Sequence, residues 1–287
     1  MNKIWMITTG DVDVPKDLAE KYGIVVIPHT IVLGDKTYKD CVDITREDFY
    51  QKVEVEKLLP RTTAINRAEV VDVCERLREK AEAVIILPHS STFGADYNVA
   101  VQAKAMVKDM RVEVVDTRQA ATAVGLIVLE AAKYTARCDD VDKILEYIEW
   151  LKANVEVLFG FKTLDYLNRS GRIGKAKALM SSVFKVTPIL TIEDGEVKAV
   201  TKVRSELQAN EMMVKIIEED LRAKGSKKAS FLLVHAWNEQ IVLALKKLLE
   251  EKFDSEIIVS EAGCSTSTFV GAGAWSIAYL PFPVETR

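Results

Sequence analysis

The chain has 287 residues, of which 48% are hydrophobic and 29% are charged, and its formal net charge is −4. This composition is typical of a globular protein whose core needs neither disulfides nor a metal. The slight acidic excess argues against a general nucleic-acid-binding or anionic-membrane surface, because both require concentrated Lys and Arg.

No segment of the sequence indicates export or membrane insertion. The apolar run near the N-terminus is followed at once by polar residues 8–11, so it is too short for a signal peptide. Residues 120–132 form one of the longest apolar segments, but they include Glu130 and fall short of the roughly 20 residues that a spanning helix needs. The cysteines are scattered without metal-ligand spacing, at positions Cys41, Cys74, Cys138 and Cys264. We expect a cytoplasmic protein with reduced thiols and no stable insertion into a membrane.

Strands and helices are predicted to alternate over the first 115 residues. The strands fall at residues 3–8, 24–27, 83–87 and 112–115, and the helices at residues 15–22, 67–80 and 97–108. A hairpin is predicted at residues 30–38, where Gly34 fits the first position of a type II′ turn, and Thr45 is the predicted N-cap of a further helix. Such alternation is typical of βαβ units, so we predict a mainly parallel, Rossmann-like sheet.

The pattern changes near residue 155, after two long predicted helices at residues 119–134 and 141–153. Asp194 and Gly195 predict the turn of a second hairpin at residues 186–203. The other predicted strands are at 157–161, 229–235 and 256–260, and the helices at 164–167, 175–184, 206–224, 238–252 and, as a buried helix, 271–280. We therefore predict a parallel α/β domain at residues 1–155 and a mixed α/β domain at residues 156–287, with a broad interface.

The sequence offers little catalytic equipment. His89 precedes Ser90 and Ser91, but adjacent residues rarely reach triad geometry, and no G-x-S-x-G elbow is present. No metal-binding or Walker pattern occurs, and the G-x-G at residues 271–273 is a weak dinucleotide signal. We predict no catalytic residue, no metal and no cofactor, so the chain is expected not to be an enzyme. An enzyme acting on a small substrate remains an alternative.

Hydroxyl groups gather at two predicted helix starts. Thr62 and Thr63 precede one helix, and Ser90 and Ser91 follow a strand whose carboxyl end leads into another. In parallel sheets ligands lie beyond strand ends, which here also lead into polar residues 8–11 and 116–118, and helix N-termini favour anions. Two such ends facing one crevice would hold a carboxylate or phosphate. The alternative is ordinary N-capping by the same hydroxyls.

Residues 161–179 read FKTLDYLNRSGRIGKAKAL, and shorter motifs lie at residues 18–24, 34–40, 42–45, 188–190, 194–195 and 202–204. On these motifs, which occur in the same order, the whole chain resembles the DegV family of bacterial fatty-acid-binding proteins. The stretch at 161–179 is the most specific of them. The resemblance implies an N-terminal parallel-sheet domain, a C-terminal mixed α/β domain, and one long-chain fatty acid in a tunnel between them. It also implies a carrier that presents the acid to a separate acyl kinase.

The family's head-group motifs match less well than its scaffold. Thr62 falls on the family's carboxylate-binding threonine, whereas Gly94 falls on its second carboxylate-binding serine and Phe269 replaces a histidine. Neighbouring hydroxyls such as those of Thr63 and Ser91 could compensate. The resemblance thus implies a fatty-acid or related lipid carrier with a modified head-group site. The alternative is a divergent relative that takes a neutral or differently headed apolar ligand, or acts only through protein contacts.

Two arginines are candidates for docking the kinase. Arg204 falls where family members carry an arginine, and Arg172 belongs to a basic linker with Arg169, Lys175 and Lys177. The alternative is that these side chains lie on solvated loops.

Overall fold

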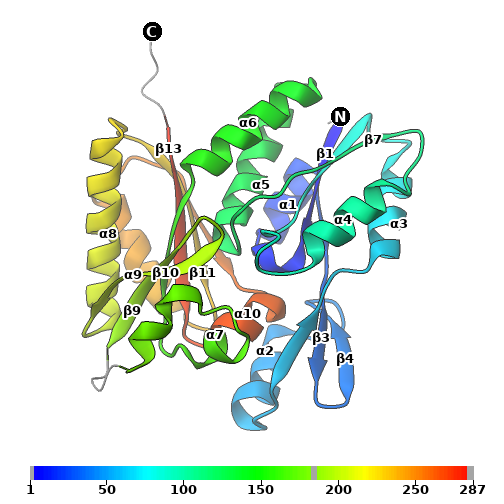
Figure 1. Ribbon diagram of the computed structural model, residues 1–287. Helices are drawn as coiled ribbons and strands as arrows, with labels where there is room; N and C mark the ends of the chain where they lie inside the picture. The colour runs from blue at the N-terminus through cyan, green and yellow to red at the C-terminus, as the bar shows by residue number, and fades with distance from the viewer. Residues whose placement is uncertain (1–2, 182–185, 283–287) are drawn as a thin grey trace.

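The computed structural model describes residues 3–181 and 186–282 and consists of two lobes that lie side by side (Figure 1). The first lobe contains a four-stranded sheet in which every neighbouring pair is parallel, as predicted. Its order is β2 (Ile24–Ile27), β1 (Ile4–Thr9), β6 (Ala83–Leu87), β7 (Arg111–Val114). One face packs against α3 (Arg67–Leu77) and α4 (Asp96–Lys104), and the other against α1 (Lys16–Tyr22). As predicted, α1 ends at Gly23, whose φ of 67° is left-handed.

A three-stranded antiparallel sheet extends from the first lobe. Its order is β4 (Lys36–Lys39), β3 (Thr30–Leu33), β5 (Pro60–Thr63), and it packs against α2 (Arg46–Tyr50), which continues into a wider turn at Gln51–Val55. The Thr45 side chain caps α2 as predicted, accepting from the amide of Asp48. The prediction that Thr62 and Thr63 open a helix is wrong. Both lie in β5, where β-branched residues pair with β3, and Asn66 caps α3 instead.

The second lobe is built on a six-stranded sheet. Its order is β10 (Glu196–Val203), β9 (Thr187–Glu193), β8 (Glu156–Gly160), β13 (Trp275–Pro281), β11 (Ala229–His235), β12 (Ile257–Glu261). Helices α8 (Glu206–Ala223) and α9 (Glu239–Glu250) cover its outer face. The prediction of a buried helix at residues 271–280 is wrong, because this segment enters the central strand β13 at Trp275. A fully buried strand is apolar on both faces, so its sequence has the same continuous pattern as a buried helix.

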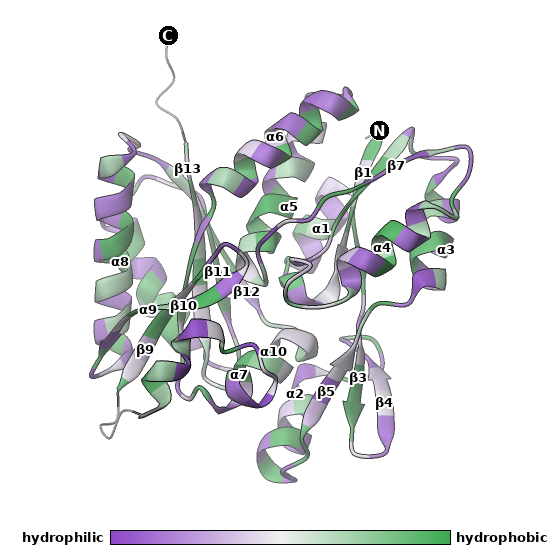
Figure 2. Cartoon of the chain, in the orientation of Figure 1, coloured by the Kyte–Doolittle hydropathy of each residue, from purple (hydrophilic) through white to green (hydrophobic). Residues whose placement is uncertain are grey.

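The helix α5 (Thr122–Thr135) joins the two lobes. It is apolar along almost its whole length (Figure 2) and packs in one core with side chains of both sheets. Helix α6 (Val141–Asn154) follows it and ends where β8 begins. Every strand of the parallel sheet precedes residue 115 and every strand of the six-stranded sheet follows residue 155. The domain boundary near residue 155 stays a prediction, because α5 belongs to both cores.

Two buried carboxylates tie the lobes together below α5. Asp13 accepts a hydrogen bond from the amide of Gly263 and Asp40 accepts from the amide of Cys264, at 2.8 Å each. These amides lie at the start of α10 (Cys264–Val270), a helix that the sequence did not predict. The remaining short helices are α7 (Asp165–Arg169) and two 3₁₀ segments, Gly10–Val12 and Gly174–Ser181. The predicted end of the helix at 175–184 lies outside the described residues. No helix among residues 3–181 and 186–282 is long and apolar enough to cross a membrane.

Candidate ligand-binding pocket between the lobes

A pocket of about 290 Å³ lies between the lobes. One wall comes from the second lobe and is apolar. It is formed by Phe159, Phe161, Leu167, Ile192 and Val197, from β8, α7, β9, β10 and the segment after β8. Phe93, Ala120 and Ala121 add apolar surface from the first lobe. This composition suits a hydrocarbon chain, because binding there removes apolar surface from water.

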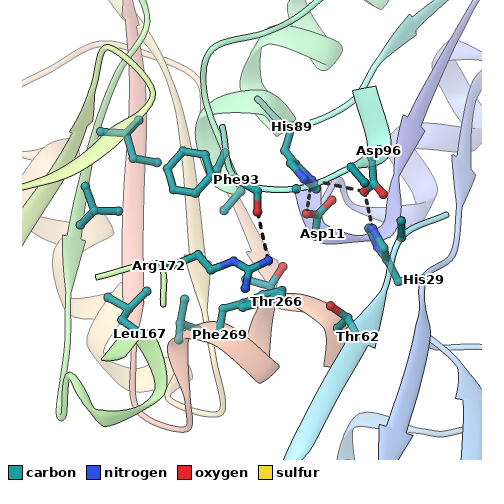
Figure 3. A pocket seen from close by; sticks show the side chains of 18 of the residues that line it. Asp11, His29, Thr62, His89, Phe93, Asp96, Leu167, Arg172, Thr266 and Phe269 are labelled. Carbon is teal, nitrogen blue, oxygen red and sulfur yellow. Dashed lines mark hydrogen bonds and ion pairs between the residues drawn. The ribbon is translucent and has the colours of Figure 1, made fainter. Parts of the chain in front are cut away.

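The opposite end of the pocket is polar and carries four ionisable side chains from three strand ends. Asp11 follows β1, His29 follows β2, His89 follows β6, and Asp96 is the first residue of α4. The carboxyl ends of adjacent parallel strands meet at one edge of the sheet, which brings these distant residues together. Figure 3 shows them converging beside the pocket. We call these four residues the His–Asp cluster.

The members of the His–Asp cluster are closely paired and largely buried. Nε2 of His29 lies 2.6 Å from Oδ2 of Asp96, and Nδ1 of His89 lies 2.7 Å from Oδ2 of Asp11. The Asp11 side chain is 13% exposed and the other three are 2–9% exposed. Burial disfavours the protonated imidazole, but Asp11 and Asp96 outweigh it and raise the pKa of His29 to about 9. Burial likewise opposes ionisation of Asp11, yet the two imidazoles hold the pKa of this carboxyl well below its ordinary value.

His89 explains why position 94 is a glycine. A Cβ atom at Gly94 would lie 2.6 Å from Nε2 of His89, closer than packed atoms approach. The imidazole therefore occupies the space that a serine side chain would need. Gly94 lines the pocket, as does Phe269, so the two departures from the family motifs meet at one site.

Arg172 lies on the pocket wall rather than wholly on the exposed linker that the sequence suggested. Its guanidinium donates hydrogen bonds to the carbonyls of Phe93, at 3.1 Å, and Ser170, at 2.6 Å. It also lies over the Phe269 ring, 5.0 Å from the ring centre. A guanidinium has five N–H donors, so two used bonds leave up to three for a ligand. A docking role for Arg172 stays a prediction.

The hydroxyl residues predicted from the sequence divide into two groups. Thr62 and Thr63 line the pocket, and the Thr62 hydroxyl has no hydrogen-bond partner among the described residues. Ser90 and Ser91 are not among the lining residues. The Ser90 hydroxyl bonds that of Thr92, and the Ser91 hydroxyl donates to Asp116 at 2.6 Å, so both serve the loop itself.

Sequence reasoning missed Asp11 and His29 as pocket residues. The rule that ligands lie beyond parallel strand ends pointed to the loops after β1 and β6, where Asp11 and His89 lie. Applied to the end of β2, the same rule would also have found His29. Arg204, by contrast, is exposed just beyond β10 and does not line the pocket.

Comparison with known proteins gives consistent matches over nearly the whole chain. Residues 3–281 match the family model described as "Uncharacterised protein, DegV family". A DegV domain-containing protein, TTE1491 of Caldanaerobacter subterraneus subsp. tengcongensis, is 31% identical over 97% of this chain and 99% of its own length.

Solved structures agree with this match. One, described as fatty acid binding of a DegV family protein from Thermus thermophilus, is 28% identical with a TM-score of 0.90, covering 98% of this chain and 100% of that chain. Another, described as DegV, a fatty acid binding protein from Bacillus subtilis, is 25% identical with a TM-score of 0.86 over 98% and 100%. The two-domain α/β fold is thus that of these neighbours, and the chain belongs to the DegV family.

Proposed function

We propose that this protein binds a long-chain fatty acid or a related lipid in the pocket between its lobes and performs no chemistry of its own. The observation that carries the proposal is the polarity of the pocket, which is apolar toward the second lobe and polar toward the strand ends of the first. An amphiphile with one head group and one acyl chain matches that arrangement. The solved relatives described as fatty-acid-binding proteins support it.

Thr62 and Arg172 are the groups best suited to hold a carboxylate. The Thr62 hydroxyl is free to donate, and Arg172 offers a guanidinium whose fork matches a carboxylate. Gly94 also lines the pocket, and its backbone amide can donate a hydrogen bond without a side chain. Loss of the family serine therefore removes one hydroxyl but leaves three other donors near the head group.

We further propose that the protein acts in the cytoplasm and presents its bound acid to a partner acyl kinase. Arg204 is the docking candidate, because it is exposed on the second lobe and lies apart from the pocket. This step rests on the family resemblance and on the exposure of that side chain.

Mass spectrometry of extracted ligands tests the lipid proposal directly. Protein purified from several hosts should release acyl chains on organic extraction, and added oleate should raise its melting temperature. Thr62→Val should weaken oleate binding more than Thr63→Val, a matched change at the next position of β5. Protein that carries no acyl chain from any host and does not respond to oleate would refute the proposal.

A second candidate ligand has a neutral or hydrogen-bond-donating head group. The observation that favours it is the pair of carboxylates, Asp11 and Asp96, at the polar end of the pocket, which repel an anion unless their charge is balanced. The same extraction decides between the two: fatty acids support the first candidate, and fatty alcohols or acylglycerols without free acids support the second.

A further inference from the structure

The His–Asp cluster has the composition of a metal site rather than that of a simple hydrogen-bonded pair. It brings two imidazoles and two carboxylates together from separate segments of the first lobe. One ligand atom from each residue lies within 4.8 Å of all the others. The sequence could not indicate this arrangement by spacing, because the four residues are spread over positions 11 to 96.

Each carboxylate of the cluster is fixed to the scaffold by one oxygen and directs the other inward. Oδ1 of Asp96 accepts from the amide of Ile65 at 3.0 Å, while its Oδ2 faces both imidazoles. Oδ1 of Asp11 accepts from the hydroxyl of Thr9 at 2.6 Å, while its Oδ2 faces His89. Outer contacts of this kind orient metal ligands before the ion binds.

His89 supplies an independent sign of a ligand between the carboxylates. Its Nδ1 lies 2.7 Å from Asp11 and 3.4 Å from Asp96, yet it has no aligned hydrogen-bond partner among the described residues. Its side chain is only 9% exposed, so water does not readily satisfy this atom. The nitrogen therefore makes a close ion-pair contact with Asp11 but no aligned hydrogen bond, and it is directed into the cluster.

The separations between the ligand atoms fit a four-coordinate ion. With bonds of about 2.0–2.1 Å, tetrahedral zinc holds its ligand atoms about 3.3 Å apart. The measured separations of 2.6, 2.7 and 3.4 Å, and the limit of 4.8 Å, bracket that value.

The charges and ligand types then select the class of ion. A metal ion must displace the imidazole protons that the two carboxylates stabilise. The two carboxylates and two neutral imidazoles then carry a charge of −2, which a divalent cation balances in this buried position. Imidazole ligands favour first-row transition metals over Ca²⁺ and Mg²⁺, which prefer oxygen. We propose that Asp11, His29, His89 and Asp96 bind one divalent transition-metal ion at the polar end of the pocket. This site goes beyond the lipid proposal and does not depend on it.

Metal titration of the full chain tests this proposal. Tag-free protein is stripped with a chelator and titrated with Zn²⁺ against a chromophoric chelator, and with Co²⁺ by visible absorption. We expect one equivalent to bind, with the absorption of tetrahedral Co²⁺. His89→Ala and Asp96→Asn should each weaken Zn²⁺ binding about a hundredfold or more. Loss of a residue that only orients a metal ligand already lowers metal affinity by about 10–100-fold, and these two residues would bind the ion directly. His235→Ala is the matched control, because this third buried histidine lies in β11 of the other lobe.

Several results would overturn the metal site. They are no binding of Zn²⁺ or Co²⁺ to the stripped protein, a Co²⁺ spectrum of octahedral type, or Zn²⁺ affinity that falls equally in His235→Ala. If His89→Ala or Asp96→Asn fails to fold, Asp11→Asn provides the test instead, because Asp11 is the most exposed member of the cluster. It should keep the circular dichroism of the wild type and bind Zn²⁺ more weakly. Lipid is extracted from the same stripped protein in a separate measurement. The lipid proposal and the metal proposal can therefore fail independently of each other.

Discussion

Most side chains at the apolar end of the pocket come from the second lobe, whereas the ionisable side chains at the polar end come from the ends of β1, β2 and β6 and the start of α4. The apolar wall presents rings and branched chains that pack into the core of the protein. The polar end presents groups that are paired with each other and anchored to the backbone. An apolar wall makes no directional contacts and so accepts many hydrocarbon chains. We therefore expect the polar end to discriminate between head groups. Changes at the two ends should therefore have separable effects.

Phe161→Ala should have the largest effect, and the effect should be on stability. Phe161 is 3% exposed and stacks near Phe159, so its truncation leaves a cavity in the core. One side of the ring already borders the pocket, so we expect a loss of about 2–4 kcal/mol in the free energy of unfolding, measured in urea.

Phe282→Ala is the matched control for that change, because Phe282 is 37% exposed. It should cost about 1 kcal/mol or less. Binding of Zn²⁺ should be unchanged in Phe161→Ala, since the His–Asp cluster lies at the other end. Equal losses of stability in Phe161→Ala and Phe282→Ala, or weaker Zn²⁺ binding in Phe161→Ala, would contradict the view that the two ends of the pocket act separately.

Gly94→Ser tests the polar end by restoring the family serine. In the wild-type background its Cβ meets Nε2 of His89, so we expect a loss of about 2 kcal/mol in the free energy of unfolding. In a His89→Ala background the space is free and the cost should largely disappear. A double-mutant cycle measures the difference as a coupling energy. The same cost in both backgrounds would show that His89 does not set the residue at position 94.

Much of the scaffold was predictable because its signals are local. The Asp194-Gly195 turn was read from two residues, and both have positive φ angles in the structure. The errors arose where a local pattern is ambiguous. Residues 271–280 are apolar in either conformation, and only pairing with β8 and β11 makes them a strand. Thr62 resembled a helix cap until its pairing with β3 placed it in β5.

The pocket was predictable only where a family motif marked it. Thr62, Gly94 and Phe269 were placed at the head group by resemblance, and all three line the pocket. His29 was missed because the strand-end rule was not applied to β2, and no short-range pattern links it to Asp96, its partner 67 residues away. Such contacts are set by the order of strands in the sheet, which the sequence leaves open. Their roles in binding stay predictions.

Arg172→Gln should weaken the binding of fatty-acid anions by about tenfold, equivalent to about 1.4 kcal/mol. The change removes the guanidinium charge that lines the pocket and the hydrogen bonds that position it. Arg169→Gln is the matched control, since Arg169 is exposed on the same segment and does not line the pocket. Calorimetry with oleate measures both variants. If the ligand is instead a neutral lipid, its affinity should be the same in both.

Arg204→Ala should have the smallest effect on the protein itself. Arg204 is exposed and lies apart from the pocket, so stability and oleate affinity should equal those of the wild type. If its guanidinium docks a kinase, phosphorylation of the bound acid by a fatty-acid kinase from the same organism should slow. A charge at the edge of an interface mainly raises the association rate, and salt screens this effect. The decrease in the phosphorylation rate should therefore be greatest at low salt.

Arg204→Lys distinguishes charge from geometry in that assay. A substitution that keeps the charge should restore most of the rate if Arg204 acts by long-range attraction, and little if the guanidinium makes paired hydrogen bonds to the kinase. Unchanged turnover in Arg204→Ala would rule out a docking role for this residue. Slower turnover together with weaker oleate binding would instead mean that the exposed edge of β10 communicates with the pocket. In that case the apolar end, which includes Val197 from the same strand, would contribute to presentation as well as to binding.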